Sequence, residues 1–309
     1  MPDNNSRNNL IQEIQKLKEE KNAVIIAHNY QRPEIQDIAD FVGDSIGLSR
    51  EAQKTDAEVI LFCGVDFMAE TANIINPEKT VLIPDTAALC PMAMRLQTNI
   101  LEYAKKLHPD AEVVLYINTR ADAKALADCI CTSSNAPQIV NSMNSNKILF
   151  GPDVNLASFV KKRSNKEIIP VPEYGLCPIH HQISTSDVKA AKRKHPDAFV
   201  VVHPECTAGV QDMADYIGST EQMINYCKNS DEKEFIMGTE NGMLHRLRKD
   251  MPDKLFYCAS ETAICPDMKM HTLEKVRDAL KYNQYEVRVP EDIANKARGA
   301  IERMLSLSK

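Results

Sequence analysis

The feature that most constrains the fold is an internal repeat, because the chain contains three copies of one pattern. The copies are "KTVLIPDTAALCPM" (79–92), "KEIIPVPEYGLCPI" (166–179) and "KLFYCASETAICPD" (254–267). Each runs from a lysine through an apolar strand to Cys-Pro, with the same 11-residue step from lysine to cysteine. The cysteines Cys90, Cys177 and Cys265 lie 87 and 88 residues apart. A fixed period of this length indicates that one structural unit occurs three times.

Further markers keep the same period. Gly64, Gly151 and Gly238 each end an apolar strand, with spacings of 87 and 87 residues. Within each copy, amphipathic helices such as "NILEYAKKL" alternate with short apolar runs such as "EVVLYIN". Apolar strands without polar alternation, separated by helices, are typical of parallel sheets that are buried on both faces.

We therefore predict an α/β fold of three similar three-layer α/β/α domains with parallel sheets, in a pseudo-threefold arrangement around a central active site. The expected domains are residues 1–98, 99–184 and 185–309, the last with a C-terminal docking helix. That helix should present the residues at helical spacing in "PEDIANKARGAIERMLSLSK", which are Ile293, Ala297, Ala300, Ile301 and Met304.

Charge and hydropathy exclude several classes of function. A net charge of -6 and a pI near 5.8 argue against nucleic-acid binding, which needs a basic surface to displace counterions. No apolar run approaches the roughly 18 residues of a membrane span or has the flanks of a signal peptide. We expect a cytoplasmic protein that acts on small molecules, with neither nucleic acid nor membrane as a partner.

Nine cysteines in a chain without an export signal favour metal binding over disulfides for some of them. In open parallel sheets, ligands collect beyond the carboxyl ends of the strands, so a common axis would bring Cys90, Cys177 and Cys265 together. Three thiolates suit zinc or an iron-sulfur cluster. A Cys3His zinc site would take His180 or His181 as its fourth ligand. The alternative is that the three cysteines are small buried hydrophobic residues at equivalent packing positions.

Polar side chains follow the first strand of each copy. They are His28 and Tyr30 in "IAHNYQ", Tyr116 and Asn118 in "LYINT", and His203 and Glu205 in "VVHPEC". Facing inward, these groups would line the same cavity as the cysteines and could supply acid, base and hydrogen-bonding functions. Taken alone, a histidine in a loop is more often only a capped or hydrogen-bonded surface group than a catalytic one.

Hydroxyl-rich helix starts at 43–45, 131–137 and 218–223 could hold anions at the positive end of a helix dipole. Each also has a structural explanation, since Ser219 with Gln222 forms a capping box and Asn135 could cap a helix. The sequence has no Walker loop, G-x-G-x-x-G, H-E-x-x-H or nucleophile elbow, so nucleotide binding and the common hydrolase schemes gain no support.

From about residue 21 to the C-terminus the chain resembles the quinolinate synthases, iron-sulfur enzymes of NAD biosynthesis. The matching motifs occur in the family's order and are "IAHNYQ", "DFVGDS", "FCGVDFMAETA", "TSSNA", "GLCPIHH", "VVHPEC", "GST", "GTENGM" and "CPDMKMHTLEKV". The resemblance implies three α/β domains and a 4Fe-4S cluster with one open iron, held by Cys90, Cys177 and Cys265. It also implies a condensation of iminoaspartate with dihydroxyacetone phosphate that gives quinolinate, phosphate and water.

The resemblance also implies roles for residues at matching positions. Tyr30, His180 and Glu205 correspond to acid-base groups. Substrate-binding positions are His28, Ser45, Tyr116, Ile117, Asn118, Ser133, His203, Pro204, Glu205 and Thr220. An enzyme that produces iminoaspartate would be a transient partner. Two alternatives stay open, a Cys3His zinc hydrolase and a non-catalytic protein that closes around a ligand.

Overall fold

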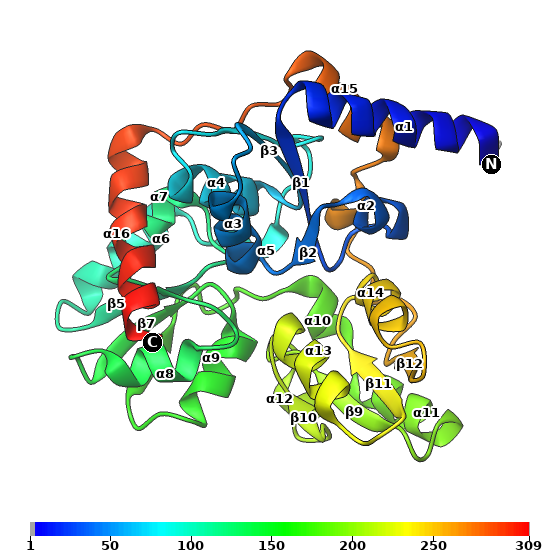
Figure 1. The fold of residues 1–309 in the computed structure, drawn as a ribbon. Coiled ribbons are helices and arrows are strands. Elements are labelled where there is room, and N and C mark those ends of the chain that lie inside the picture. Colours follow the sequence, from blue (N-terminus) through cyan, green and yellow to red (C-terminus); the bar gives the residue numbers. More distant parts are fainter. Residues whose placement is uncertain (1–3, 309) are drawn as a thin grey trace. The chain divides into compact units, whose positions relative to one another are not determined.

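Three parallel four-stranded sheets with one strand order form the framework of the protein (Figure 1). The computed structural model describes residues 4–308, without the side chains at positions 4, 5, 45, 49 and 52. The first sheet has the order β2-β1-β3-β4, the second β6-β5-β7-β8 and the third β10-β9-β11-β12. The prediction of three α/β/α domains with parallel sheets is confirmed.

The strands are short, as the apolar runs predicted. Those of the first sheet are β1 (Ala23–His28), β2 (Phe41–Gly43), β3 (Val59–Cys63) and β4 (Thr80–Leu82). Those of the second sheet are β5 (Glu112–Tyr116), β6 (Cys129–Cys131), β7 (Lys147–Gly151) and β8 (Glu167–Pro170). Those of the third sheet are β9 (Phe199–Val202), β10 (Tyr216–Ile217), β11 (Glu234–Gly238) and β12 (Leu255–Cys258).

The register of the strands repeats as well. The central pairs align Ala23 with Val59, Glu112 with Ile148, and Phe199 with Phe235, at the same sequence offset each time. The side chains of β1, β3, β5, β7, β9 and β11 are buried over nearly their whole length. Apolar side chains on both faces therefore meet helices, which explains why the strands lack polar alternation.

Helices connect the strands. The first 95 residues contain α1 (Asn4–Glu20), α2 (Pro33–Ile38), α3 (Ser45–Lys54), α4 (Asp66–Ile75) and α5 (Pro91–Arg95). The middle contains α6 (Thr98–Leu107), α7 (Ala121–Lys124), α8 (Ala136–Ser142), α9 (Val154–Lys161), α10 (Pro178–Gln182) and α11 (Thr185–Lys194). The last part contains α12 (Ala208–Gln211), α13 (Thr220–Asn229), α14 (Met243–Asp250), η1 (Asp267–Lys269), α15 (Leu273–Tyr282) and α16 (Glu291–Leu307).

Two side chains of the repeat hold each copy together. The aspartates Asp40, Asp128 and Asp215 accept the backbone N–H of Ile25, Val113 and Val200 at 2.7–2.8 Å. The lysines that open the three Cys-Pro segments each donate to a backbone carbonyl that follows the C-terminal end of a helix. The contacts are Lys79 to Thr55 at 2.7 Å, Lys166 to Ser145 at 2.9 Å and Lys254 to Ser230 at 2.6 Å. The lysine therefore recurs because in each repeat it satisfies a backbone carbonyl in the segment that follows a helix.

Contacts divide the chain into two units. The first contains residues 4–90 and 265–291, and the second contains 91–264 and 292–308. In the first unit, α15 packs against α1 and β3 and adds Leu273, Val276 and Leu280 to the core of the first sheet. The segment after α15 forms an antiparallel bridge from Glu286 to Leu82 at the edge of that sheet. The first sheet is thus completed by residues from the far end of the chain.

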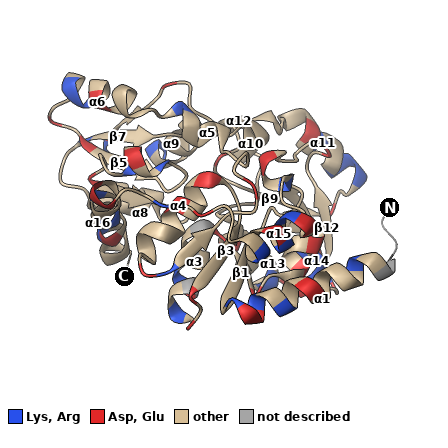
Figure 2. Cartoon of the chain, turned by 90° about the horizontal axis from the view of Figure 1, so that it is seen from above, with Lys and Arg blue, Asp and Glu red and all other residues tan. Residues whose placement is uncertain are grey.

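The second unit contains two sheets and the C-terminal helix. Helix α16 buries Ala294, Ala297, Ala300, Ile301 and Met304, while Ile293 is half-buried. Arg303 donates to a Glu112 carboxylate oxygen at 3.1 Å and to the Asp128 carbonyl at 3.1 Å, so α16 docks on elements of the second sheet. Positively and negatively charged residues both occur along the length of α1 and of α16 (Figure 2). Among residues 4–308, no helix has both the length and the hydropathy to cross a bilayer.

Candidate functional site

Each repeated cysteine lies one or two residues before a short helix. Cys90 precedes α5, Cys177 precedes α10 and Cys265 precedes the turn of η1. Cys177 is extended, with φ -76° and ψ 114°, and proline occupies the first position of the helix that follows. Proline fits there because that position has no intrahelical use for an N–H. The three thiols are half-buried, whereas Cys63, Cys129, Cys131, Cys206 and Cys227 are buried.

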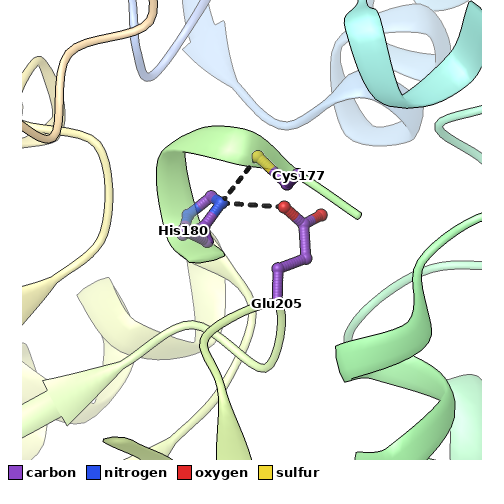
Figure 3. A group of neighbouring side chains, drawn as sticks. All are labelled: Cys177, His180 and Glu205. Atoms are coloured by element: carbon purple, nitrogen blue, oxygen red, sulfur yellow. Dashed lines mark hydrogen bonds and ion pairs between the residues drawn. The ribbon is translucent and has the colours of Figure 1, made fainter. Parts of the chain in front are cut away.

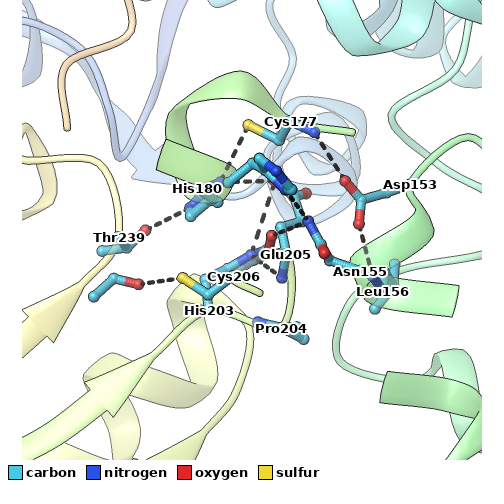
Figure 4. Close-up of polar contacts among 12 residues, drawn as sticks. Asp153, Asn155, Leu156, Cys177, His180, His203, Pro204, Glu205, Cys206 and Thr239 are labelled. Carbon is cyan, nitrogen blue, oxygen red and sulfur yellow. Dashed lines mark hydrogen bonds and ion pairs between the residues drawn. The ribbon is translucent and has the colours of Figure 1, made fainter. Parts of the chain in front are cut away.

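An acidic side chain fixes the backbone of two of these cysteines. The Cys90 N–H donates to Asp66 Oδ1 at 3.0 Å, and the Cys177 N–H donates to Asp153 Oδ2 at 2.9 Å. Asp153 also caps α9 by accepting the Leu156 N–H at 2.6 Å (Figure 4). Burial and the negative charge of Glu205 raise the pKa of the Asp153 carboxyl well above its usual value, against the effect of the backbone donors.

Cys177, His180 and Glu205 form a compact group in the second unit (Figure 3). His180 Nδ1 lies 2.8 Å from Glu205 Oε2 and 3.2 Å from Cys177 Sγ. Its Nε2 lies 3.0 Å from the Thr239 hydroxyl. The potential ligand atoms of the three residues all lie within 4.8 Å of one another, so the group could hold a metal ion.

Glu205 is buried, with 2% of its surface exposed. Burial acts to raise the pKa of its carboxyl, but the charges of His180 and His203 outweigh burial. Hydrogen bonds from His180 and Tyr116 act in the same direction, and the pKa falls to about 2. A carboxylate only accepts hydrogen bonds, so both the His180 Nδ1–H and the Tyr116 hydroxyl donate to it.

His203 stacks on His180, with ring centroids 4.6 Å apart. Its Nδ1 accepts the Glu205 backbone N–H at 3.3 Å. Burial lowers the pKa of the His203 imidazole to about 3, and the neighbouring Glu205 opposes this shift only in part. A neutral ring, Glu205 and His180 therefore lie in contact, an arrangement that can bind a polar substrate and transfer protons.

Asn155 joins the segment after β7 to this group. Its Nδ2 donates to the Glu205 carbonyl at 3.0 Å (Figure 4). The same nitrogen lies 3.2 Å from His181 Nδ1. His181 itself is exposed. In "GLCPIHH", His181 therefore contacts the side-chain amide of Asn155, whereas His180 contacts Cys177 and Glu205.

The second unit brings together five predicted site residues, Tyr116, Cys177, His180, His203 and Glu205. Loop residues adjoin them in sequence: the Ile117 N–H donates to the Cys131 carbonyl at 2.8 Å, and the Pro204 carbonyl accepts from Gln211 at 2.9 Å. Asn118 is half-buried.

The two other positions predicted in the second unit lie at helix starts. Ser133 is buried just before α8, and Thr220 is buried at the first position of α13. The capping box of Ser219 and Gln222 is confirmed. Asn135 occupies the N-cap position of α8 as expected, but its side chain accepts the Thr132 N–H at 2.7 Å and makes no capping hydrogen bond to the helix.

The first unit contains the remaining predicted residues, His28, Tyr30, Cys90 and Cys265. His28 and Tyr30 are buried, with their rings in edge contact at 4.6 Å. Ser45 begins α3, and its side chain lies outside the described part of the structure.

Sequence reasoning missed Asp66, Asp153, Asn155 and Thr239. A signal for the aspartates was present, because Asp66, Asp153 and Glu240 follow the three repeated glycines by two residues. Asn155 and Thr239 carry no such pattern, since their importance depends on contacts between segments far apart in the sequence.

Three sheets of one topology, with a buried carboxylate and imidazoles beside an accessible thiol, define a multidomain α/β enzyme. Comparison with known proteins identifies its family. Residues 12–306 match the family described as Quinolinate synthetase A protein. The quinolinate synthase of Thermodesulfovibrio yellowstonii is 52% identical over 300 residues, covering 97% of this chain and 99% of the relative.

Other relatives agree. The quinolinate synthase of Thermococcus onnurineus is 54% identical over 299 residues, covering 97% of this chain and 98% of the relative. That of Pyrococcus horikoshii is 52% identical over 300 residues, covering 97% and 99%. The chain belongs to the quinolinate synthase family.

Proposed function

We propose that this enzyme condenses iminoaspartate with dihydroxyacetone phosphate to give quinolinate, phosphate and water in the de novo synthesis of NAD. The observation that carries the proposal is the buried contact of Glu205 with His180 beside Cys177, at positions where the family has acid-base groups and a cluster ligand. Ring formation requires several proton transfers, and a buried carboxylate–imidazole pair is suited to them.

The chain's own residues suggest how protons are held. Glu205 Oε2 accepts a hydrogen bond from His180 Nδ1–H. The contact between His180 Nε2 and the Thr239 hydroxyl keeps the imidazole oriented. The Tyr116 hydroxyl holds the same carboxylate. Tyr30 is the third acid-base group of the proposal. The substrates would be bound by His28, Ser45, Tyr116, Ile117, Asn118, Ser133, His203, Pro204, Glu205 and Thr220.

We propose Cys90, Cys177 and Cys265 as the ligands of a 4Fe-4S cluster. The residues fit this group, because the three thiols are half-buried and the backbones of Cys90 and Cys177 are fixed by carboxylates. Thiolates are the usual ligands of such clusters. When bound by three cysteines, the cluster would supply an open iron as a Lewis acid toward a substrate oxygen.

The proposed ligand set requires the three domains to face a common axis, in the pseudo-threefold arrangement expected from the repeat. The boundaries at residues 98 and 184 belong to this proposal, as do a cytoplasmic location and transient contact with an enzyme that supplies iminoaspartate. The segments after residue 264 pack on the first and second sheets, so the third sequence repeat extends beyond its own sheet.

Anaerobic purification followed by iron and sulfide analysis tests the cofactor. We expect brown protein with about four irons and four sulfides, and Cys90→Ala, Cys177→Ala or Cys265→Ala should each abolish incorporation. Cys227→Ala is the matched control, because burial raises the pKa of the Cys227 thiol to about 12 and keeps it protonated. Colourless protein with one zinc would favour the zinc hydrolase instead.

An anaerobic assay tests the reaction. Iminoaspartate and dihydroxyacetone phosphate should give quinolinate and inorganic phosphate. Ligand binding without turnover in cluster-loaded protein would favour the non-catalytic binding protein.

A further inference from the structure

Cys177, His180 and Glu205 bring three different donor atoms to one place (Figure 3). A sulfur, an imidazole nitrogen and a carboxylate oxygen lie within 4.8 Å of one another, and all three residues belong to the second unit. His180 Nδ1 lies between the other two, 2.8 Å from Glu205 Oε2 and 3.2 Å from Cys177 Sγ. The group shares Cys177 with the proposed cluster but uses neither Cys90 nor Cys265, so it is a different ligand set.

The spacing of these atoms suits a tetrahedral metal ion. With metal distances of about 2.3 Å to sulfur and about 2.0–2.2 Å to nitrogen and oxygen, neighbouring ligand atoms lie about 3.4–3.6 Å apart. Starting from 2.8 and 3.2 Å, the atoms around His180 Nδ1 have to separate by only about 0.4–0.6 Å. Three protein ligands leave the fourth position to water, as in catalytic zinc sites.

The two buried ligands are each held by further residues of the same unit. His180 Nε2 lies 3.0 Å from the Thr239 hydroxyl (Figure 4). The Tyr116 hydroxyl is hydrogen-bonded to the Glu205 carboxylate, and Asn155 Nδ2 donates to the Glu205 carbonyl at 3.0 Å. Imidazoles and carboxylates that bind metals ordinarily have such outer partners, which fix their orientation. The ligand atoms are therefore already positioned without an ion.

Charge and ligand type select the ion. A thiolate at Cys177 and a carboxylate at Glu205 balance the two charges of a divalent ion, so the buried site stays neutral. On binding, the Cys177 thiol releases its proton to water. The His180 ring takes the tautomer with its proton on Nε2, where the Thr239 oxygen can accept it. Sulfur and imidazole favour zinc and related transition metals, whereas magnesium and calcium prefer oxygen ligands.

We propose that Cys177, His180 and Glu205 form a mononuclear site for a divalent transition metal, above all zinc, in protein that lacks the cluster. A sulfur bound to this ion is not available to the cluster, so zinc binding and cluster assembly exclude each other at Cys177. The metal site depends only on its own geometry. The competition rests on the proposed function, because it requires Cys177 to be a cluster ligand.

Cobalt is the probe, because a thiolate bound to Co²⁺ gives a charge-transfer band in the near ultraviolet that reports sulfur coordination. The full-length Cys90→Ala protein, treated with a chelator, is titrated with Co²⁺. This variant lacks one proposed cluster ligand and keeps all three ligands of the mononuclear site. We expect about one cobalt per chain with a thiolate band, displaced by zinc and not by magnesium.

Substitutions added to Cys90→Ala assign the ligands. Loss of an outer partner costs about 10–100-fold in metal affinity, which is the effect expected of Thr239→Val. His180→Ala and Glu205→Gln each remove a ligand and should weaken cobalt binding by more than about 100-fold. His181→Ala is the matched control for His180→Ala, because it removes the neighbouring exposed imidazole, and it should bind cobalt as the Cys90→Ala protein does.

Three results would overturn the metal site. The first is loss of cobalt binding in Cys90→Ala itself, since that outcome would indicate a zinc site of the Cys3His type. The second is unchanged affinity in folded His180→Ala or Glu205→Gln protein, as judged by circular dichroism. The third is unchanged affinity in Thr239→Val, which keeps every ligand and decides the question if the ligand variants do not fold.

Reconstitution tests the competition. Unchanged protein loaded with zinc before anaerobic addition of iron and sulfide should take up less of both than zinc-free protein, and equal uptake would overturn the competition. Failure of zinc-free protein to form any cluster would reject the proposed cofactor, while the cobalt result would still decide the mononuclear site. A cluster in the unchanged protein without cobalt binding in Cys90→Ala would reject this inference and leave the proposed function standing.

Discussion

The Asp153 carboxylate holds Cys177 by its backbone, with 2.9 Å between Oδ2 and the cysteine nitrogen. The other carboxylate oxygen accepts the Leu156 N–H, so one buried side chain satisfies donors on two segments. Asp66 holds Cys90 in the same way. The proposed ligand loops are therefore fixed by the protein itself.

Asp153→Asn should destabilise the protein. The amide group can accept one of the two backbone N–H groups and must direct its own N–H toward the other. We expect a loss of about 1–3 kcal/mol in the free energy of unfolding, as for a buried donor without an acceptor. Urea denaturation measures it. Asp212→Asn removes only an exposed contact with Lys162 and should cost less than about 1 kcal/mol. Equal effects of the two substitutions would contradict this role of Asp153.

The contributions of His203 and Glu205 to stability should fall as the pH falls, opposite in sign to that of Asp153, whose pKa is raised. The folded pKa of His203 is about 3 against an ordinary 6.5, so stability is complete above about pH 6.5 and is lost toward pH 3 as the unfolded chain gains a proton. The depressed pKa of Glu205 adds a second loss between about pH 4.5 and 2. His203→Gln removes the first component. Its unfolding temperature should drop less between about pH 7 and pH 4 than that of the unchanged protein, and an equal drop would contradict the His203 assignment.

Asn155→Asp should disturb the acid-base group without a change in side-chain size. The new carboxylate places an acceptor against the Glu205 carbonyl, where the amide donated at 3.0 Å, and adds negative charge nearby. Like charge raises the pKa of a carboxyl. The acidic limb of the pH profile of quinolinate formation should move to higher pH. Asn141→Asp, at an exposed site, should leave the profile in place; a matching shift there would refute the local explanation.

The C-terminal helix should be held by its apolar face more than by its ion pair. Met304 is 1% exposed, so Met304→Ala should cost about 2–5 kcal/mol. Arg303→Ala removes a partly exposed pair with Glu112 and should cost about 1 kcal/mol or less. Limited proteolysis of α16 and thermal unfolding would rank the two, and a reversed order would show that the ion pair dominates.

The three sheets were predictable because the same order of apolar strands and amphipathic helices recurs about every 87 residues. The repeat could not specify which sheet an element covers. Helix α15 follows Cys265 as α6 follows Cys90 and α11 follows Cys177, yet it packs on the first sheet. The described residues 4–308 form no fourth sheet for it to cover.

The site was predictable where a residue occupies a repeated strand end, as His28, Tyr116 and His203 do. Their contacts were not, because Asn155 and Thr239 reach Glu205 and His180 through packing between segments about 50 to 60 residues apart. The Asp66 and Asp153 contacts were within reach of the repeat, since both aspartates share one distance from a repeated glycine.

The packing of α15 also bears on the order in which the protein can fold during synthesis. Domains generally fold as they leave the ribosome, N-terminal first. Here the first sheet lacks Leu273, Val276 and Leu280 until the end of the chain has been made. The first sheet is translated first, yet its core cannot be completed until α15 has been made, so its apolar face stays exposed or bound to a chaperone for most of the period of translation.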